Sequence, residues 1–184
     1  MYLALPPFNL SPGTITCLHI PHGLEEAGQA LEYQLFQLAA RFGKAISISR
    51  PAGYEAGTVG LSLTESSAGW LSRFAGLSEQ AASQTIAKSG VKMSERIAYN
   101  AGTPKAVLGI LVALLKEPEV LAYSTEALDL EGCRTVHRFV ALRCSSICVV
   151  HISYPSYFGD GTPFPRVCPP GAQCIEVTKG SQTA

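Results

Sequence analysis

The chain has 184 residues, of which 47% are hydrophobic and only 15% are charged. This length fits one domain, and the charged fraction lies well below the roughly 25% of an ordinary soluble domain, so either the core is large or a partner covers part of the surface. Fourteen basic residues balance fourteen acidic ones, which excludes a strong overall field that would attract nucleic acid or anionic lipid.

The first residues, MYLALPPFNLSPG, have the composition of an irregular arm. They lack a basic region and carry three prolines where a signal peptide has its apolar stretch. The longest apolar helical run, VLGILVALL at 107–115, is much shorter than the roughly 20 residues that cross a bilayer. We therefore expect a cytoplasmic protein, without membrane contact, in which Cys168 and Cys174 remain unpaired thiols. In an oxidising compartment these two cysteines, at the ends of CPPGAQC, would close a small loop.

A strand, a helix and a second strand follow this arm. TITCLHI (14–20) alternates as a strand, and GLEEAGQALEYQLFQLAARFG (23–43) has helical spacing with Glu25 in its first turn and Gly43 as its stop. KAISISR (44–50) is the second strand. Such short joints predict a parallel pair of strands with a right-handed crossover.

The middle of the chain is predicted to be mainly helical. TVGLSLTE (58–65) alternates as one more strand, and the pattern from Trp70 to Lys116 is helical. Ser78 is the expected N-cap of one helix and Gly90 its stop, while Thr103 and Pro104 start a helix that is apolar nearly all round. We expect this last helix to lie in the middle of the fold.

The next three segments are predicted to form an antiparallel meander. They are TEALDLEG (125–132), RTVHRFVALR (134–143) and ICVVHISY (147–154), with His137 on the face of Phe139 as a core histidine. Prolines and glycines interrupt everything after Pro155.

The predicted fold is therefore a single α/β or α+β domain with a mixed sheet. It has an N-terminal β-α-β unit, a central helical segment, a C-terminal antiparallel β-meander and irregular terminal arms. The predicted boundaries are an arm over 1–13, a core domain over 14–154 and a Pro/Gly-rich arm over 155–184.

The stretch CLHIPHG holds the one candidate site. Cys17, His19 and His22 lie at a strand end beside a helix start, where the helix terminus and an imidazole could activate a thiol and backbone amides could hold an oxyanion. The same side chains could bind zinc, with a fourth ligand from Cys133, His137 or solvent. Cys17 is also a good small core residue, and this structural interpretation is favoured.

Other motifs are incomplete. The segment 79–99 has a helix-turn-helix character with basic residues around Gly90, but Ala87 precedes that glycine by one position too few, so a pair of core helices is favoured. SGVK (89–92) lacks its companion K-T-G motif, and the chain contains no G-x-S-x-G, P-loop or G-x-G-x-x-G motif. Cys148 and His151 face opposite ways on a strand, so a metal shared by the two is not expected.

These observations favour a non-catalytic interaction or assembly protein, either self-associating as a homo-oligomer or part of a larger protein complex. No cofactor is expected, and nucleic acid is not an expected partner. One alternative is a small thiol-dependent hydrolase or transferase with Cys17 as nucleophile and His19 or His22 as base. A second alternative is a nucleic-acid-binding regulator that acts through residues 79–99.

Overall fold

A computed structural model describes residues 3–4, 10–42, 46–48, 51–52, 63–126, 128–155 and 167–179. Its centre is a five-stranded sheet in the order β3-β4-β5-β2-β6, in which every neighbouring pair is parallel. The strands are β2 (Ile15–His19), β3 (Ile46–Ile48), β4 (Val120–Ser124), β5 (Cys148–Ser153) and β6 (Gln173–Glu176). Beside the sheet, β1 (Leu3–Ala4) and β7 (Thr178–Lys179) form a short antiparallel pair.

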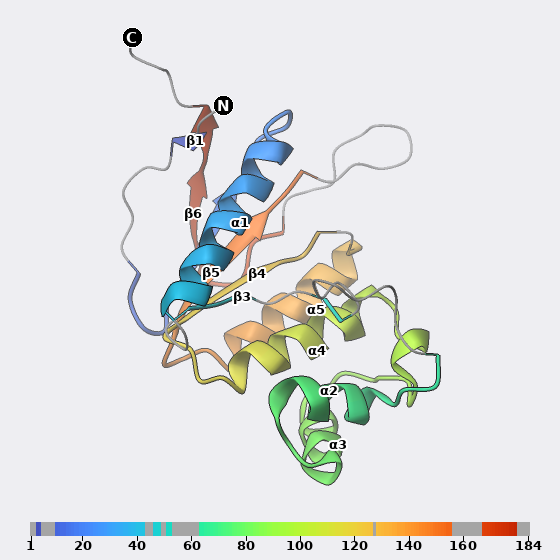
Figure 1. The fold of residues 1–184 in the computed structure, drawn as a ribbon. Coiled ribbons are helices and arrows are strands. Elements are labelled where there is room, and N and C mark those ends of the chain that lie inside the picture. The colour runs from blue at the N-terminus through green and yellow to red at the C-terminus, as the bar shows by residue number, and fades with distance from the viewer. Residues whose placement is uncertain are drawn as a thin grey trace.

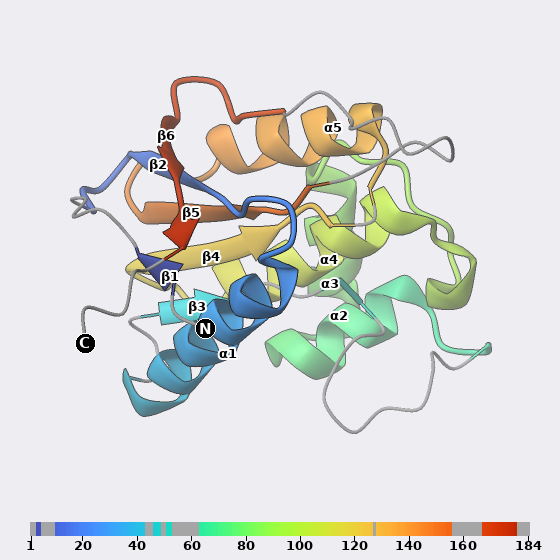
Figure 2. The same ribbon diagram turned by 90° about the horizontal axis from the view of Figure 1, so that it is seen from above.

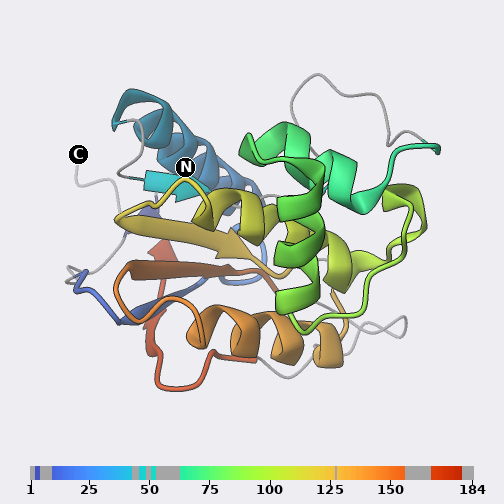
Figure 3. The same cartoon turned by 90° about the horizontal axis from the view of Figure 1, so that it is seen from below.

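Helices cover both faces of the sheet, as Figures 1, 2 and 3 show. One face packs against α1, and the other packs against α4 and α5, while α2 and α3 lie on the far side of α4. The helices are α1 (Glu25–Phe42), α2 (Ser67–Ala75), α3 (Glu79–Lys88), α4 (Gly102–Leu114) and α5 (Leu130–Ala141), with a 3-10 turn η2 (Ile97–Tyr99) between α3 and α4. None of the helices in the described part of the chain is long and apolar enough to span a membrane.

All five residues of β2 are buried because helices cover both sides of the strand. Leu18, together with Ile20 beyond the strand end, belongs to an apolar cluster that also contains Leu24 and Ile152 and that lies under α1. Ile15 faces the opposite layer and packs with residues of α4 and α5. Cys17 and His19 share the face of Ile15, because side chains alternate along a strand.

Several predicted helix signals are confirmed. The Ser78 hydroxyl accepts a hydrogen bond from the Ala81 N–H at the start of α3, and Gly90, with φ of +73°, follows the end of that helix. Helix α4 is buried over most of its length and belongs to the larger core cluster, as its apolar sequence predicts.

The predicted antiparallel meander is wrong, because residues 130–141 form helix α5 and β5 pairs in parallel with β2 and β4. The Asp129 side chain caps the helix by accepting the Gly132 N–H. The buried residues Val136, Phe139 and Val140 follow the three-and-four spacing of a helix face. The α/β class is therefore correct, and the mixed sheet is not, since this sheet is entirely parallel.

Three further expectations need correction or lie outside the described residues. Strands β2 and β3 are parallel members of one sheet, but β5 and β4 lie between them, so they do not pair directly. The C-terminal segment that we expected to be irregular supplies β6, the fifth strand of the sheet. Of the predicted strand 58–65, residues 58–62 lie outside the described residues, and 63–65 are not extended into a strand.

The segment 79–99 does not form a helix-turn-helix. Helix α3 is followed by an irregular stretch and then by the three-residue η2. Asn100 holds this stretch in place, because its side-chain oxygen accepts the Ser94 N–H at 2.8 Å and its amide donates to the Ser67 hydroxyl at 2.8 Å. No second helix in this segment is available to enter a DNA groove.

Candidate metal centre

A row of polar side chains crosses the sheet on the face that α5 covers. Cys174 on β6 is the direct partner of Cys17 on β2, Cys17 is the partner of His151 on β5, and His151 is the partner of Tyr123 on β4. In-register residues of parallel strands point to the same face. The parallel register therefore brings together residues from β2 and from the C-terminal segment that are distant in the sequence.

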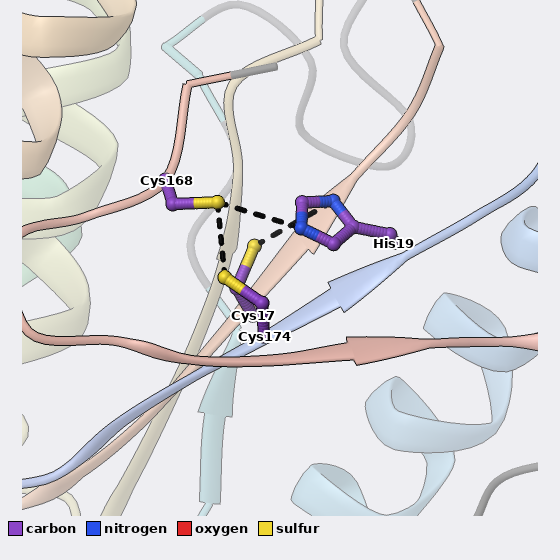
Figure 4. Close-up of side chains that lie close together, drawn as sticks. All are labelled: Cys17, His19, Cys168 and Cys174. Atoms are coloured by element: carbon purple, nitrogen blue, oxygen red, sulfur yellow. Dashed lines mark hydrogen bonds between the residues drawn. The ribbon is translucent and has the colours of Figure 1, made fainter.

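Four sulfur and nitrogen side chains converge at the β6 end of this row (Figure 4). Cys17 and His19 come from β2, Cys174 comes from β6, and Cys168 comes from the turn before β6. One ligand atom from each residue lies within 4.8 Å of the other three. The sulfurs of Cys174 and Cys168 lie 3.0 Å apart, and the Cys168 sulfur lies 3.4 Å from His19 Nε2. The Cys17 sulfur lies 4.0 Å from His19 Nδ1.

The sequence between the two C-terminal cysteines explains their approach. In CPPGAQC the Ala172 N–H donates to the Pro169 carbonyl at 3.1 Å, which closes a turn. Gly171 adopts φ of +72° in that turn, a conformation that glycine tolerates better than other residues. The turn reverses the chain so that Cys168 returns over Cys174 as β6 begins.

The arrangement suits a zinc ion. Tetrahedral zinc with bonds of about 2.3 Å to sulfur and about 2.0 Å to nitrogen holds its ligand atoms roughly 3.5–3.8 Å apart. With His19 Nε2 as the ligand atom, the distances of 3.0 Å between the sulfurs of Cys174 and Cys168 and 3.4 Å between the Cys168 sulfur and that nitrogen need to change by less than an ångström to reach that geometry. Three cysteines and one histidine form a ligand set of structural zinc sites, and soft sulfur ligands disfavour magnesium and calcium.

A second layer of hydrogen bonds supports the cluster. His151 Nδ1 lies 3.1 Å from the Cys17 sulfur, and its Nε2 lies 3.0 Å from the Thr125 hydroxyl. The ring of His137 on α5 stacks edge-on against His151 with 4.5 Å between ring centroids. His137 Nδ1 lies 2.9 Å from the Tyr123 hydroxyl. Such partners fix the orientation of a metal ligand.

Burial disfavours the charged forms of Cys17, Cys174 and His151. Desolvation raises the pKa of the Cys17 thiol far above its usual range, and the neighbouring Cys168 and Cys174 raise it further. Desolvation and the contact with Cys168 also raise the pKa of Cys174 to about 11. Desolvation lowers the pKa of His151 well below its usual value, with smaller contributions from His137 and His19. The cysteines must lose protons to bind a metal, so metal binding would release protons.

Only some of the site residues predicted from the sequence lie together in the structure. Cys17 and His19 belong to the cluster, whereas His22 is exposed and its Nδ1 lies 3.1 Å from Glu25 Oε1. Neither Cys133 nor His137, the expected fourth ligands, is among the clustered residues. The Cys133 sulfur instead lies near the carbonyl oxygens of Thr125 and Leu128.

Sequence analysis did not identify Cys168 and Cys174 as ligands. Their spacing around a Pro-Pro-Gly turn was the available signal, because such a turn brings its two ends together. Their proximity to Cys17 depends on β6 pairing with β2, which a sequence pattern does not reveal.

The geometry is a poor fit to a nucleophilic thiol. Cys17 is fully buried, and its raised pKa leaves little thiolate at neutral pH. The turn between β2 and α1 is equally unsuited to anions, because Pro21 lacks an N–H and the first helical turn carries Glu25 and Glu26. These features favour a ligand role for Cys17 over a catalytic one.

No protein-family model and no curated protein match the sequence. Among solved structures, the fold is similar to that of cbiO1 from Clostridium perfringens, described as part of the ABC transporter complex cbiONQ. The TM-score is 0.55 and the identity is 16%, over 80% of this chain and 69% of that chain. At this identity the similarity establishes an α/β fold with a parallel sheet and gives no information on activity.

Proposed function

We propose that this chain binds one Zn²⁺ through Cys17, His19, Cys168 and Cys174 and acts as a non-catalytic interaction or assembly protein. The observation that carries the proposal is the convergence of these four ligand atoms within 4.8 Å of one another, from two strands and a turn. β6 pairs with β2 in regular parallel register, and this pairing places Cys174 beside Cys17 without a distortion of the sheet.

The role we assign to the metal is structural. Four protein ligands complete a tetrahedral shell, whereas a catalytic zinc keeps one position open for water or substrate. The ion would join β6 and its preceding turn to β2. β6 is an edge strand of the sheet and most of its residues are exposed, so it gains little stability from burial. Metal ligation that links β6 to the buried strand β2 would compensate for this small gain in stability.

The interaction role rests on the surface. β6 is the last strand in the sheet order, so one of its edges has no partner among the described strands. Such an edge can pair with a strand of another chain. Large apolar side chains are also exposed, with Leu142 at 74% and Tyr99 at 64%. A cytoplasmic, self-associating protein is consistent with these features and with the low charge of the sequence.

Metal analysis of the purified protein tests the proposal. We expect native mass spectrometry and elemental analysis to find one zinc per chain. Cys174→Ser, which alters an exposed residue outside both core clusters, should weaken zinc binding by roughly a hundredfold to a thousandfold. This estimate assigns to each ligand a quarter of the roughly 10–16 kcal/mol of a structural zinc site.

The matched control is Cys133→Ser, a cysteine outside the cluster. It should bind zinc as tightly as the unaltered protein. Loss of zinc from both variants, or zinc binding that Cys174→Ser leaves unchanged, would contradict the assignment of ligands.

Sedimentation equilibrium tests the assembly part separately. We expect the zinc-loaded chain to form a concentration-dependent oligomer. If the chain binds zinc but sediments as a strict monomer and captures no defined partner chain, self-association is refuted. The proposed metal site is then unaffected.

A further inference from the structure

The four ligands of the cluster differ in their access to solvent. Cys17 and His19 are buried, with exposed fractions of 0% and 3%. Cys168 and Cys174 are both exposed. The two sulfurs of the exposed pair lie 3.0 Å apart. A soluble oxidant would therefore meet two adjacent thiols before it reached the third.

The chain between the exposed cysteines is already closed. The hydrogen bond from the Ala172 N–H to the Pro169 carbonyl, 3.1 Å long, holds the turn, and Pro169 and Pro170 restrict the backbone of its first two positions. A disulfide in this position would close a loop whose ends are already together, so little chain entropy opposes it. Its formation would remove two of the four metal ligands, because a disulfide sulfur has no thiolate charge to bind zinc.

We propose that a hydroperoxide oxidises Cys168 and Cys174 to a disulfide and thereby releases the bound zinc, so that the metal centre is a reversible redox switch. The inference rests on the proposed zinc-binding function and adds the regulation of that site. The pairing of exposed with buried ligands is the feature that a purely structural site does not require.

The oxidation consumes two thiolates and one hydroperoxide in two steps. One thiolate attacks the hydroxyl oxygen of the hydroperoxide, the O–O bond breaks, and a sulfenic acid forms; hydroxide leaves when the oxidant is hydrogen peroxide, and an alkoxide leaves when it is an organic hydroperoxide. The second thiolate attacks the sulfur of the sulfenic acid, the S–O bond breaks, a disulfide forms and hydroxide leaves. Two thiolates are oxidised by two electrons and the peroxide is reduced. Zinc does not change its oxidation state and dissociates from Cys17 and His19, and Cys17 then takes a proton.

Loss of the zinc ion would affect β6, the edge strand of the sheet. With the disulfide formed, the turn before β6 remains closed, but the metal bond that joins it to β2 is lost. Backbone pairing of β6 with β2 then depends on Ile175, the one buried residue of that strand. We expect oxidation to loosen β6 and the adjoining turn without unfolding the rest of the sheet, and a thiol reductant with added zinc to reverse the change.

Hydrogen peroxide added to the zinc-loaded full chain tests the inference. A chromophoric zinc indicator follows metal release, and peptide mass mapping of quenched samples follows each cysteine. We expect about one zinc released for each Cys168–Cys174 disulfide, with the same time course, while Cys17 stays reduced. Dithiothreitol and added zinc should restore the starting state. Cys133→Ser should behave as the unaltered chain, which excludes that thiol as the oxidised group.

Two results would overturn the inference. Zinc retained after the disulfide has formed would show that the exposed pair does not hold the ion, and zinc release that follows oxidation of Cys17 without the disulfide would show a different route. Zinc loading is measured before the peroxide is added, so a failure of zinc binding can be distinguished from a failure of the redox switch. A chain that takes up no zinc refutes the proposed function, and a chain that takes up zinc but fails either criterion refutes only the switch.

Discussion

Leu18 and Cys17 are neighbours on β2 and are equally buried, with exposed fractions of 1% and 0%, but they face different layers of the molecule. Leu18 packs under α1 with Ile152 and other apolar residues. Cys17 faces the α5 side, where its sulfur meets His151. One face of the strand is stabilised by apolar burial, and the other holds polar groups that need specific partners.

The difference shows how one strand can serve both stability and function. The apolar face tolerates approximate packing, since any side chain of the right volume contributes free energy. On the polar face each group depends on the position of its partner, because an unpaired buried polar atom costs about 1–3 kcal/mol. Substitutions on the two faces should therefore differ in whether they change stability, zinc affinity or the dependence of stability on pH.

The largest effect on stability is expected on the apolar face. Leu18→Ala removes a buried side chain under α1 and should lower the free energy of unfolding of the metal-free protein by about 2–5 kcal/mol. Urea unfolding measures this change. Zinc affinity should stay as in the unaltered protein, because Leu18 points away from the cluster. An equal loss of zinc affinity in this variant would show that the two faces are not independent.

The next effect is a dependence of stability on pH at His137. Burial lowers the pKa of this histidine from 6.5 to about 4, so the folded state holds it neutral while the unfolded chain takes up a proton. The stabilisation is fully present above pH 6.5 and is lost as the pH falls towards 4, by about 3 kcal/mol at most.

Urea unfolding of the metal-free protein at a series of pH values tests this prediction. His137→Phe should reduce the loss of stability in acid, whereas His22→Phe, at an exposed histidine, should keep it. The same acid profile in both variants would assign the pH dependence to other groups.

A smaller effect is expected at His151, which positions Cys17 through the 3.1 Å contact with its sulfur. Replacing such a supporting residue typically weakens metal binding by about 10–100-fold. His151→Gln should weaken zinc binding within this range and shift the absorption of the Co²⁺-substituted protein, since the ligand geometry changes. A competition titration gives the affinity. An unchanged affinity and spectrum would mean that His151 only fills space.

The smallest effect concerns the helix that covers the polar face. Asp129→Ala removes the side chain that accepts the Gly132 N–H at the start of α5 and should cost about 1 kcal/mol. Asp129→Asn should keep most of this stability, because asparagine also caps helices. Zinc affinity should not change in either variant. A loss much larger than that of an ordinary cap would show that α5 and the cluster are coupled.

The sequence was informative where the signal was local. The strand 14–20 and the helix after it lie where their patterns placed them, because alternation and helix-terminal residues act within a few positions. Helix α5 was mistaken for a strand because His137, Phe139 and Ala141 alternate, while the buried Val136, Phe139 and Val140 follow helical spacing. Asp129, a residue type that commonly caps helix N-termini, was the local signal that distinguished the two.

Only half of the candidate metal centre was predictable from the sequence, and the reason is different. Cys17 and His19 lie two positions apart on one strand, so their common face follows from the sequence. Cys174 reaches them only because β6 adds to the sheet beside β2, and Cys168 only because the turn folds back. Such register is determined by tertiary packing and not by local pattern.

X-ray absorption at the zinc edge of the metal-loaded protein is the most direct test of the central claim, because it reports the atoms bonded to the ion. We expect three sulfur atoms at about 2.3 Å and one nitrogen at about 2.0–2.1 Å from the ion. A shell with fewer than three sulfur atoms, or with additional oxygen ligands, would show that Cys17, His19, Cys168 and Cys174 do not together form the metal centre.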